Sequence, residues 1–263
     1  MGYKFSRPEL RIQTAKTASF TADPGKLYPV DLGSVTADLV LTFPSSPNTN
    51  DKFGVYVSAT HSSGGTSTDF IDRPFFCIEP ANTTSINGAS YAADSGDGSG
   101  VYGLWQNVES LVFVYDGSTW RILNDGRIPF KARLSLASAQ TITNVTPTNV
   151  DYDTDDSDVM GMHSTSSNTE RVIVKRAGDY QVNALFRWGT SGVGLRFGEV
   201  RDHDSNILAK YRINATGDGD EGSPVGNVDL AAGDYVYARC YQSSGSGLDL
   251  TSTGNSFNVT EVL

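Results

Sequence analysis

The 263-residue sequence is poor in sulfur and in basic side chains, and it lacks any long apolar run. It holds two cysteines and three methionines, and its 20 Lys and Arg face 30 Asp and Glu, a formal net charge of −10. Two cysteines cannot build a disulfide framework, and no zinc spacing is present. The acidity argues against a nucleic-acid partner, which needs a basic surface. No run reaches the roughly 18 apolar residues of a membrane span, so no membrane partner is expected.

The two cysteines, Cys77 and Cys240, lie in different halves of the sequence. One disulfide between them is an alternative, but two unpaired thiols in a β core are the preferred prediction. The first residues, MGYKFSRPELRIQ, contain no apolar core of roughly 7–15 residues, so we do not expect a secretory signal.

What the sequence does contain is typical of an all-β protein. Aspartate outnumbers glutamate by 23 to seven, and there are 27 glycines. Aspartate and glycine favour turns, whereas glutamate favours helices. Hydrophobic residues make up 38% of the chain, which suffices for a packed core and excludes wholesale disorder.

Alternation of apolar and polar residues marks strands in both halves of the sequence. Leu111, Phe113 and Tyr115 lead into Asp116-Gly117, which is a hairpin signal. The sequence shows no repeat period, so a β-helix is not predicted. We expect four segments: a basic arm at residues 1–16, a β-rich module at 17–125, a linker at 126–131 and a second domain at 132–263.

Three spaced elements organise the second half. They are Ala177-Gly178 with Tyr180 and Val182, then Leu230, Gly233, Asp234 and Val236, then Ser256, Phe257 and Val259. In this order they resemble the C1q/TNF-like jelly-roll family over residues 132–263. The resemblance implies a homotrimer of two-sheet sandwiches, with aromatic residues in the core or along the trimer axis. These residues are Tyr180, Phe186, Trp188, Tyr235 and Tyr237.

The first half carries an ordered set of positions, most of which are aromatic, proline or aspartate. They are Tyr28, Val30, Asp31, Leu41, Pro44, Pro47, Asp51, Tyr115, Asp116, Gly117 and Trp120. This set resembles a module of phage tail-fibre and virion proteins, which implies a β-sandwich or barrel-like unit on the outside of a phage particle. The predicted fold is therefore an all-β chain in which such a module precedes a jelly roll.

Carboxylates gather at one place in the second half. Asp151, Asp153, Asp155, Asp156 and Asp158 are weak calcium candidates, because carboxylate oxygens suit this cation. The EF-hand pattern fails, since Asp156 stands where glycine is required and Met162 where glutamate is required. We favour a solvated acidic loop without metal. Asp218, Asp220 and Glu221 receive the same interpretation.

No arrangement of residues indicates catalysis or a bound cofactor. Gly98, Gly100 and Gly103 spell a dinucleotide-binding pattern, but no helix is expected after them. The histidines, His61, His163 and His203, accompany no hydrolase or metalloprotease signature. We expect a protein that is not an enzyme.

Two further groups are candidate contacts with partners. Lys4, Arg7, Arg11 and Lys16 concentrate positive charge in the arm and are predicted to bind a partner. Tyr91, Tyr102 and Trp105 lie in glycine-rich sequence, where exposed rings could contact a sugar or a protein; a core role for Trp105 is favoured.

The function expected from both resemblances is a structural one. The chain would be a homotrimeric capsid decoration or cement protein, or a short head fibre, bound to the major capsid protein or another shell protein. It would be made in the host cytoplasm and reside on the virion. The alternative is a tail-fibre or receptor-binding protein that recognises a host-surface glycan. Fibres need a stalk, and the sequence offers no heptads, collagen repeat or β-helix period.

Overall fold

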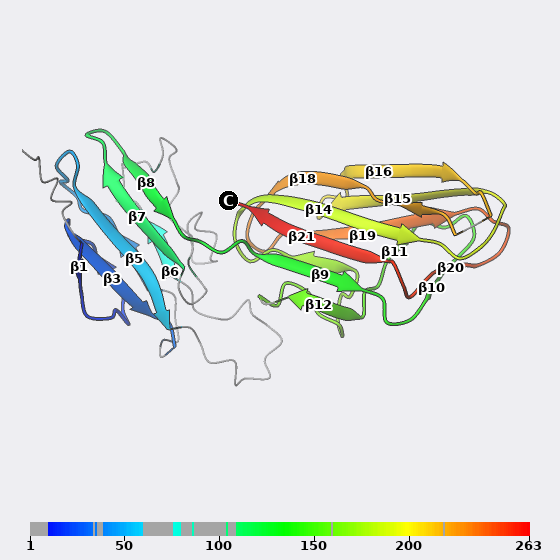
Figure 1. Ribbon diagram of the computed structural model, residues 1–263, viewed down its shortest axis with the longest axis horizontal. Helices are drawn as coiled ribbons and strands as arrows, with labels where there is room; N and C mark the ends of the chain where they lie inside the picture. Colours follow the sequence, from blue (N-terminus) through cyan, green and yellow to red (C-terminus); the bar gives the residue numbers. More distant parts are fainter. Residues whose placement is uncertain are drawn as a thin grey trace, which may run out of the picture. The chain divides into compact units, whose positions relative to one another are not determined.

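The computed structural model describes residues 10–33, 35, 39–59, 76–79, 86, 104, 109–158, 160–217 and 219–263. Every regular element in these ranges is a β-strand, so the all-β prediction is confirmed. The chain divides into two compact units, and the boundary falls between Ile128 and Pro129. Each unit is an independent set of paired sheets (Figure 1).

In the part of the first unit that the structure describes, eight strands form two sheets. They are β1 (Arg11–Ile12), β2 (Phe20–Thr21), β3 (Lys26–Asp31), β4 (Leu39–Thr42), β5 (Lys52–Ala59), β6 (Phe76–Glu79), β7 (Ser110–Tyr115) and β8 (Trp120–Asp125). One sheet has the order β1-β3-β5-β7-β8 and the other the order β2-β4-β6. The chain therefore passes back and forth between the two sheets up to β6.

This alternation makes the first six strands parallel within each sheet. β1, β3 and β5 pair in parallel in one sheet, and β2, β4 and β6 do so in the other. A parallel pair needs a crossover connection, and here each crossover is a strand of the opposite sheet. The strands β1, β3 and β5 begin at residues 11, 26 and 52, and this uneven spacing explains why the sequence shows no repeat.

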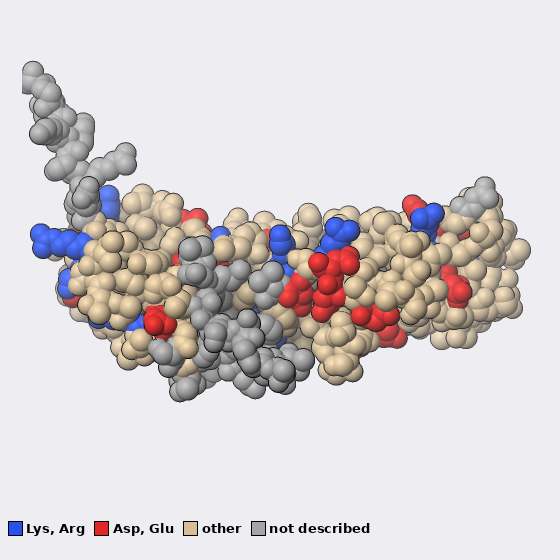
Figure 2. Space-filling model, turned by 60° about the horizontal axis from the view of Figure 1, so that its bottom comes forward, with Lys and Arg blue, Asp and Glu red and all other residues tan. Residues whose placement is uncertain are grey.

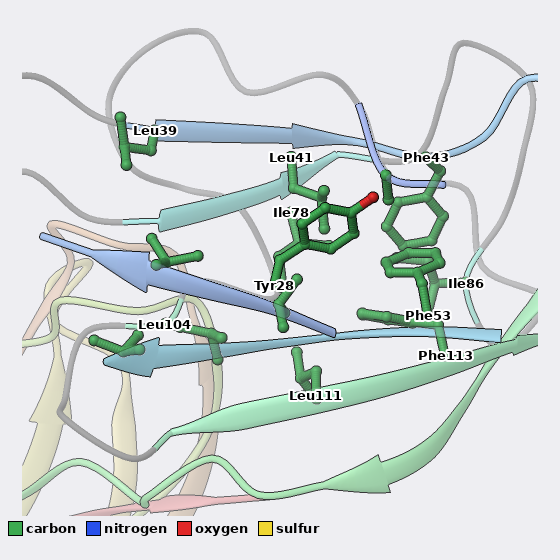
Figure 3. Close-up of a cluster of buried hydrophobic side chains, with 14 of the residues drawn as sticks. Tyr28, Leu39, Leu41, Phe43, Phe53, Ile78, Ile86, Leu104, Leu111 and Phe113 are labelled. Carbon is green, nitrogen blue, oxygen red and sulfur yellow. The ribbon is translucent and has the colours of Figure 1, made fainter. Parts of the chain in front are cut away.

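The two sheets of the first unit enclose one apolar core (Figure 3). Leu41 from β4 and Phe53 from β5 are fully buried in it. The Phe43 ring stands edge-on to the rings of Phe53 and Trp120, with centroids 5.0 and 5.4 Å away. Such aromatic pairs add about 0.5–1.5 kcal/mol each beyond the area they bury, so this cluster fixes how the sheets pack.

Residues 10–16 are the edge of the first sheet rather than a free arm. The amides of Arg11, Gln13 and Lys16 donate to carbonyls of the segment that holds β3. The ammonium of Lys16 lies 5.3 and 5.6 Å from the ring centroids of Phe20 and Tyr28. The expected arm at residues 1–16 therefore lies against the first sheet from residue 10 onward, because backbone pairing needs no apolar pattern. Lys4 and Arg7 lie outside the described residues.

Asp116 organises the hairpin between β7 and β8 that the sequence predicted. Its carboxylate accepts hydrogen bonds from the Thr119 and Ser118 amides, at 2.8 and 2.9 Å, and from the Arg121 guanidinium, at 2.8 Å. The hydrogen bond from Thr119, followed by that from Arg121, holds the pKa of Asp116 well below its ordinary value. Gly117 takes a positive φ of 100°, which explains the Asp-Gly pair at this turn.

The segment 126–131, expected to be a linker, is built into the two units. The Gly126 amide pairs with the Ser110 carbonyl, and the Ile128 amide donates to the Glu109 carboxylate at 2.9 Å. Phe130 is fully buried in the second unit. Polar backbone groups close to a core are paired as a rule, and here Gly126 and Ile128 pair within the first unit.

The second unit contains thirteen strands in the described residues. They are β9 (Lys131–Ser135), β10 (Gln140–Ile142), β11 (Thr148–Asn149), β12 (Thr154–Asp158), β13 (Arg171–Ile173), β14 (Gly178–Arg187), β15 (Leu195–Asp202), β16 (Ile207–Asn214), β17 (Glu221–Gly222), β18 (Val225–Leu230), β19 (Tyr235–Gln242), β20 (Leu248–Leu250) and β21 (Ser256–Val262).

Eleven of these strands form the two layers of a jelly roll, as the sequence predicted, and β10 and β20 pair with each other. One layer has the order β12-β9-β21-β14-β17, with β18 also paired to β14. The other has the order β11-β19-β15-β16, with β13 also paired to β19. Except for β15 and β16, strands adjacent in a layer are not consecutive in sequence, and all pairs are antiparallel. Closure of one layer over the other buries one face of each.

Tyr180, Phe186 and Trp188 lie in the core between the two layers. Each is at most 1% exposed. The Tyr180 hydroxyl donates to the Arg176 carbonyl, and the Trp188 indole donates to the Tyr211 hydroxyl, both at 2.7 Å. Burial raises the pKa of Tyr211. The sequence predicted that these three residues lie in the core or along a trimer axis. In the structure they fill the core of the second unit.

Cys240 faces the same core from β19 and is a free, buried thiol. Burial raises its pKa, which leaves little reactive thiolate. The structure therefore confirms, for Cys240, the unpaired thiol that the sequence favoured.

A buried ion pair holds the start and the end of the second unit together. Arg176 donates to both carboxylate oxygens of Glu261, at 2.7 and 2.5 Å. The same carboxylate accepts the Phe130 amide at 3.0 Å, and the guanidinium lies 4.0 Å from the centre of the Phe130 ring. The Arg176 and Glu261 side chains are 0% and 2% exposed. Their mutual attraction therefore offsets much of the hydration free energy that each loses on burial.

At another end of the unit, a loop before β15 packs against the residue that follows β19. Gly194 has a φ of +85°, and the Leu195 amide donates to the Ser243 hydroxyl at 2.9 Å. The buried Arg196 guanidinium donates to the carbonyls of Val193 and Leu195, at 3.0 and 3.1 Å. Backbone and guanidinium thus fix this loop from two sides.

Candidate functional site

The outer face of the β19-β15-β16 layer concentrates positive charge and aromatic rings. Side chains alternate along a strand; Val236, Ala238 and Cys240 of β19 point into the core, so their neighbours point outward. We call this surface the cationic face. Its members are Arg171 (β13), Phe197, Glu199 and Arg201 (β15), Lys210 and Arg212 (β16), and Tyr235, Tyr237, Arg239 and Tyr241 (β19).

A stack of rings and one ammonium crosses the three strands. Phe197 and Tyr241 are cross-strand partners whose rings are stacked, with centroids 4.7 Å apart and planes 6° apart. The Lys210 ammonium lies 3.9 Å from the Phe197 centroid. Because β15 lies between β19 and β16, Phe197 is covered on both sides. The rings serve as supports for the cation.

A second cation lies on aromatic rings farther along β19. The Arg171 guanidinium is 4.6 Å from the Tyr235 centroid, and the Tyr235 and Tyr237 rings are 6.2 Å apart. The Tyr237 hydroxyl donates to the Ser205 hydroxyl at 3.2 Å. Tyr235 and Tyr237, assigned by the sequence to core or trimer axis, therefore belong to the outer face of their layer.

One carboxylate sits among these cations. Glu199 accepts hydrogen bonds from Lys210 and Arg201, both at 2.7 Å, and its side chain is 3% exposed. Its burial would raise its pKa, but the bonds from Lys210 and Arg201 outweigh that effect and lower the pKa. Glu199 stays ionised and fixes the two cations in register.

Two cations of the face remain without such a partner. Within the described residues, neither the Arg212 nor the Arg239 side chain makes a hydrogen bond or an ion pair. Arg212 is exposed and Arg239 is half-buried. Their strand positions place them beside Phe197 and Glu199, which they face across the ladder. They are the groups of this face that are free to bind.

The five aspartates proposed as weak calcium candidates already bond to the protein. Asp153 accepts the Ala137 amide at 2.6 Å, and Asp158 accepts the amides of Met162 and His163 at 3.0 and 2.8 Å. The other three bind side chains: Asp151 binds Gln140, Asp155 binds His163 and Asp156 binds Ser135. Burial raises the pKa of Asp158. Figure 2 shows acidic side chains gathered over this part of the molecule.

We expect calcium to leave the stability of the protein nearly unchanged. Within the described residues no cluster of His, Cys, Asp and Glu could hold a metal ion. A ligand that binds only the folded state would stabilise it in proportion to its affinity. Differential scanning fluorimetry with millimolar CaCl₂ and with EDTA should give melting temperatures within about 1 °C of each other. A saturable upward shift of several degrees would contradict this.

The second acidic group and the histidines also have structural contacts. Asp220 accepts the amide and hydroxyl of Thr216, at 3.0 and 2.7 Å, and Glu221 pairs with Arg187 at 3.1 Å. The buried His163 ring bridges Asp155 and the Thr169 carbonyl, at 2.6 and 3.0 Å. His203 lies edge-on to Tyr235. Asp218 and His61 lie outside the described residues.

Some candidates from the sequence cannot be placed. Tyr91, Tyr102 and Trp105, as well as the glycines Gly98, Gly100 and Gly103, lie outside the described residues. Of the basic arm, Arg11 is exposed on β1, and the Lys16 ammonium packs on the rings of Phe20 and Tyr28.

The cationic face could not be predicted from the sequence, because its cations come from four separate strands. Arg201, Lys210, Arg212 and Arg239 look like isolated charges in an acidic chain. From the sequence, Tyr235 and Tyr237 were expected in the core or along a trimer axis. What the sequence could not supply was the strand order that places Phe197 and Lys210 on the same face as these tyrosines.

Comparisons with known proteins give a likeness to solved structures over about half of the chain. No protein-family model and no curated protein matches the sequence. Among solved structures, murine APRIL at pH 5.0 is 13% identical with a TM-score of 0.40, covering 51% of this chain and all of its own. Eiger TNF from S. frugiperda is 15% identical with a TM-score of 0.37, covering 52% of this chain and 94% of its own. This likeness says nothing about what the chain binds.

The described residues contain no helix that is both long and apolar enough to cross a membrane.

Proposed function

We propose that this chain is a non-enzymatic structural protein of a phage particle, which decorates or cements the shell as a homotrimer. The ordered motifs of the first half support the setting. Their residues occupy structural positions in the first unit: Tyr28 and Trp120 lie in the core, and Asp116 and Gly117 form the hairpin turn. The jelly roll of the second unit supports the trimer, as an implication of its sequence resemblance.

The observation that carries the proposal is the cationic face. A chain of net charge −10 that presents several cations on one sheet face has a surface suited to attachment. Its rings and Glu199 hold Arg171, Arg201 and Lys210 in place, which reduces the entropy that these side chains lose on binding. Three such faces in one trimer would bind together, and multivalency raises the effective affinity well above that of one face.

The test is addition of purified protein to phage particles that lack it. We expect the free protein to have the mass of three 28.2 kDa chains in analytical ultracentrifugation, and gold-labelled protein to decorate the heads of particles in electron micrographs. Monomers, or label confined to tail tips or host cells, would overturn the proposal and favour receptor binding.

A companion variant separates the two basic regions. Deletion of residues 1–9 removes Lys4 and Arg7 but keeps β1, whose pairing begins at Arg11. If the cationic face makes the attachment, this variant should decorate particles as the intact chain does. Loss of decoration would instead assign attachment to the N-terminal residues.

A further inference from the structure

We propose that the cationic face binds a carboxylate-bearing protein surface, with Arg212 and Arg239 as the residues that contact it. This inference rests on the proposed function, because it names the chemistry of the partner to which the chain attaches. It follows from the charge of the face, the coverage of its rings and the two guanidinium groups left unpaired.

The charge of the face decides the sign of the partner. Arg171, Arg201, Lys210, Arg212 and Arg239 lie on it. Two carboxylates pair with these cations: Glu170 with Arg171, and Glu199 with Arg201 and Lys210. The remaining positive charge on an acidic chain is complementary to an anionic surface and repels basic ones.

The rings of the face distinguish between anionic partners. Sugars and nucleobases are held by aromatic faces that are open to stacking. Here Phe197 is covered by Lys210 on one side and by Tyr241 on the other, and the Arg171 guanidinium covers Tyr235. The rings therefore support cations rather than offer a platform for a sugar or a base.

The unpaired guanidinium groups indicate carboxylates. A guanidinium matches a carboxylate through two parallel hydrogen bonds, and such pairs are stronger than neutral ones. Arg212 and Arg239 lie on β16 and β19, on either side of β15. A layer of strands with two such groups on its outer face fits the folded surface of an acidic protein, which can present carboxylates at fixed spacing.

The experiment measures binding of the full chain to immobilised poly-L-glutamate, heparin and single-stranded DNA by biolayer interferometry at low salt. We expect binding to poly-L-glutamate that exceeds binding to heparin and DNA. The double variant Arg212→Glu and Arg239→Glu should weaken poly-L-glutamate binding by at least about tenfold, since like charges then meet.

The matched control carries the same change of charge on the opposite layer. Lys131 and Arg133 are exposed on β9, and Lys131→Glu with Arg133→Glu alters the net charge equally. This variant should weaken binding by less than about twofold, because only the screened long-range attraction is reduced. Circular dichroism checks that both variants are folded.

Three results would overturn the inference. The first is equal weakening by the two double variants, which would mean attraction by net charge alone. The second is stronger binding to heparin or DNA, which would make the partner a glycan or a nucleic acid. The third is a change of oligomeric state in the Arg212/Arg239 variant, which would make the face a contact between copies of this chain.

Particle binding then separates this inference from the proposed function. If particles bind the intact chain and both double variants equally, the proposed function stands and the assignment of the face fails. If the poly-L-glutamate series behaves as expected but particles are not decorated, the chemistry of the face stands and the proposed function fails.

Discussion

Replacement of Arg176 by alanine is expected to destabilise the second unit by about 3–5 kcal/mol. The substitution leaves Glu261 buried without the guanidinium that now donates to both of its oxygens. It also removes the cation from the Phe130 ring. Urea denaturation followed by tryptophan fluorescence should show a lower midpoint for the second unit, which contains Trp188.

Two comparisons make the Arg176 result specific. Arg133→Ala breaks an exposed pair with Asp156, 3.5 Å apart, and should cost at most about 1 kcal/mol. The double variant Arg176→Met and Glu261→Leu should lose less stability than Arg176→Ala, because no charge stays buried alone. If Arg176→Ala costs no more than Arg133→Ala, the pair does not hold the unit together.

Replacement of Gly194 by alanine is expected to cost about 3–5 kcal/mol, from backbone strain and overpacking together. At a φ of +85° any L-residue is strained, and here the new Cβ would overlap the Ser243 carbonyl oxygen. That oxygen belongs to the backbone that follows β19, so it cannot turn away as a side chain would. Thermal unfolding by circular dichroism measures the loss.

Gly245 provides the matched control. Its φ is +96°, yet a Cβ there would meet no atom within 4 Å. Gly245→Ala should therefore cost only the strain, about 1–2 kcal/mol. Equal losses at the two positions would show that the contact with Ser243 is relieved at little cost and that strain alone matters.

Much of the fold follows from alternation and turn residues. Tyr180, Val182, Ala184 and Phe186 mark the buried side of β14, and the Asp234 carboxylate accepts the Ala231 amide at the turn predicted there. Local signals of this kind do not contain strand order. The sequence could not predict that β1, β3 and β5 pair in parallel, nor that β2, β4 and β6 do, because alternation looks the same in parallel and antiparallel sheets. The two residues of β1 are moreover exposed, so no apolar pattern marks this strand.

The candidate site could be predicted only in fragments. The sequence predicted Tyr235 and Tyr237 in the core or along a trimer axis but did not tell which side of the layer they occupy. A strand with large residues on both sides needs its neighbours before its inner face is known. Here Cys240 and Val236 are inside and the tyrosines outside, under Arg171 and beside Ser205.

The position of β21 constrains the order in which the second unit can fold. β21, the last strand, lies between β9 and β14. The edge of β9, the first strand, that faces β14 therefore has no partner until β21 is in place. Phe130 and Glu261, which bond at this junction, are 131 residues apart in sequence. Closure over so long a loop comes late, because its entropy cost precedes the contacts that repay it. Until then β9 is an open edge, and a chain interrupted before β21 would leave β14 exposed to pairing with other chains.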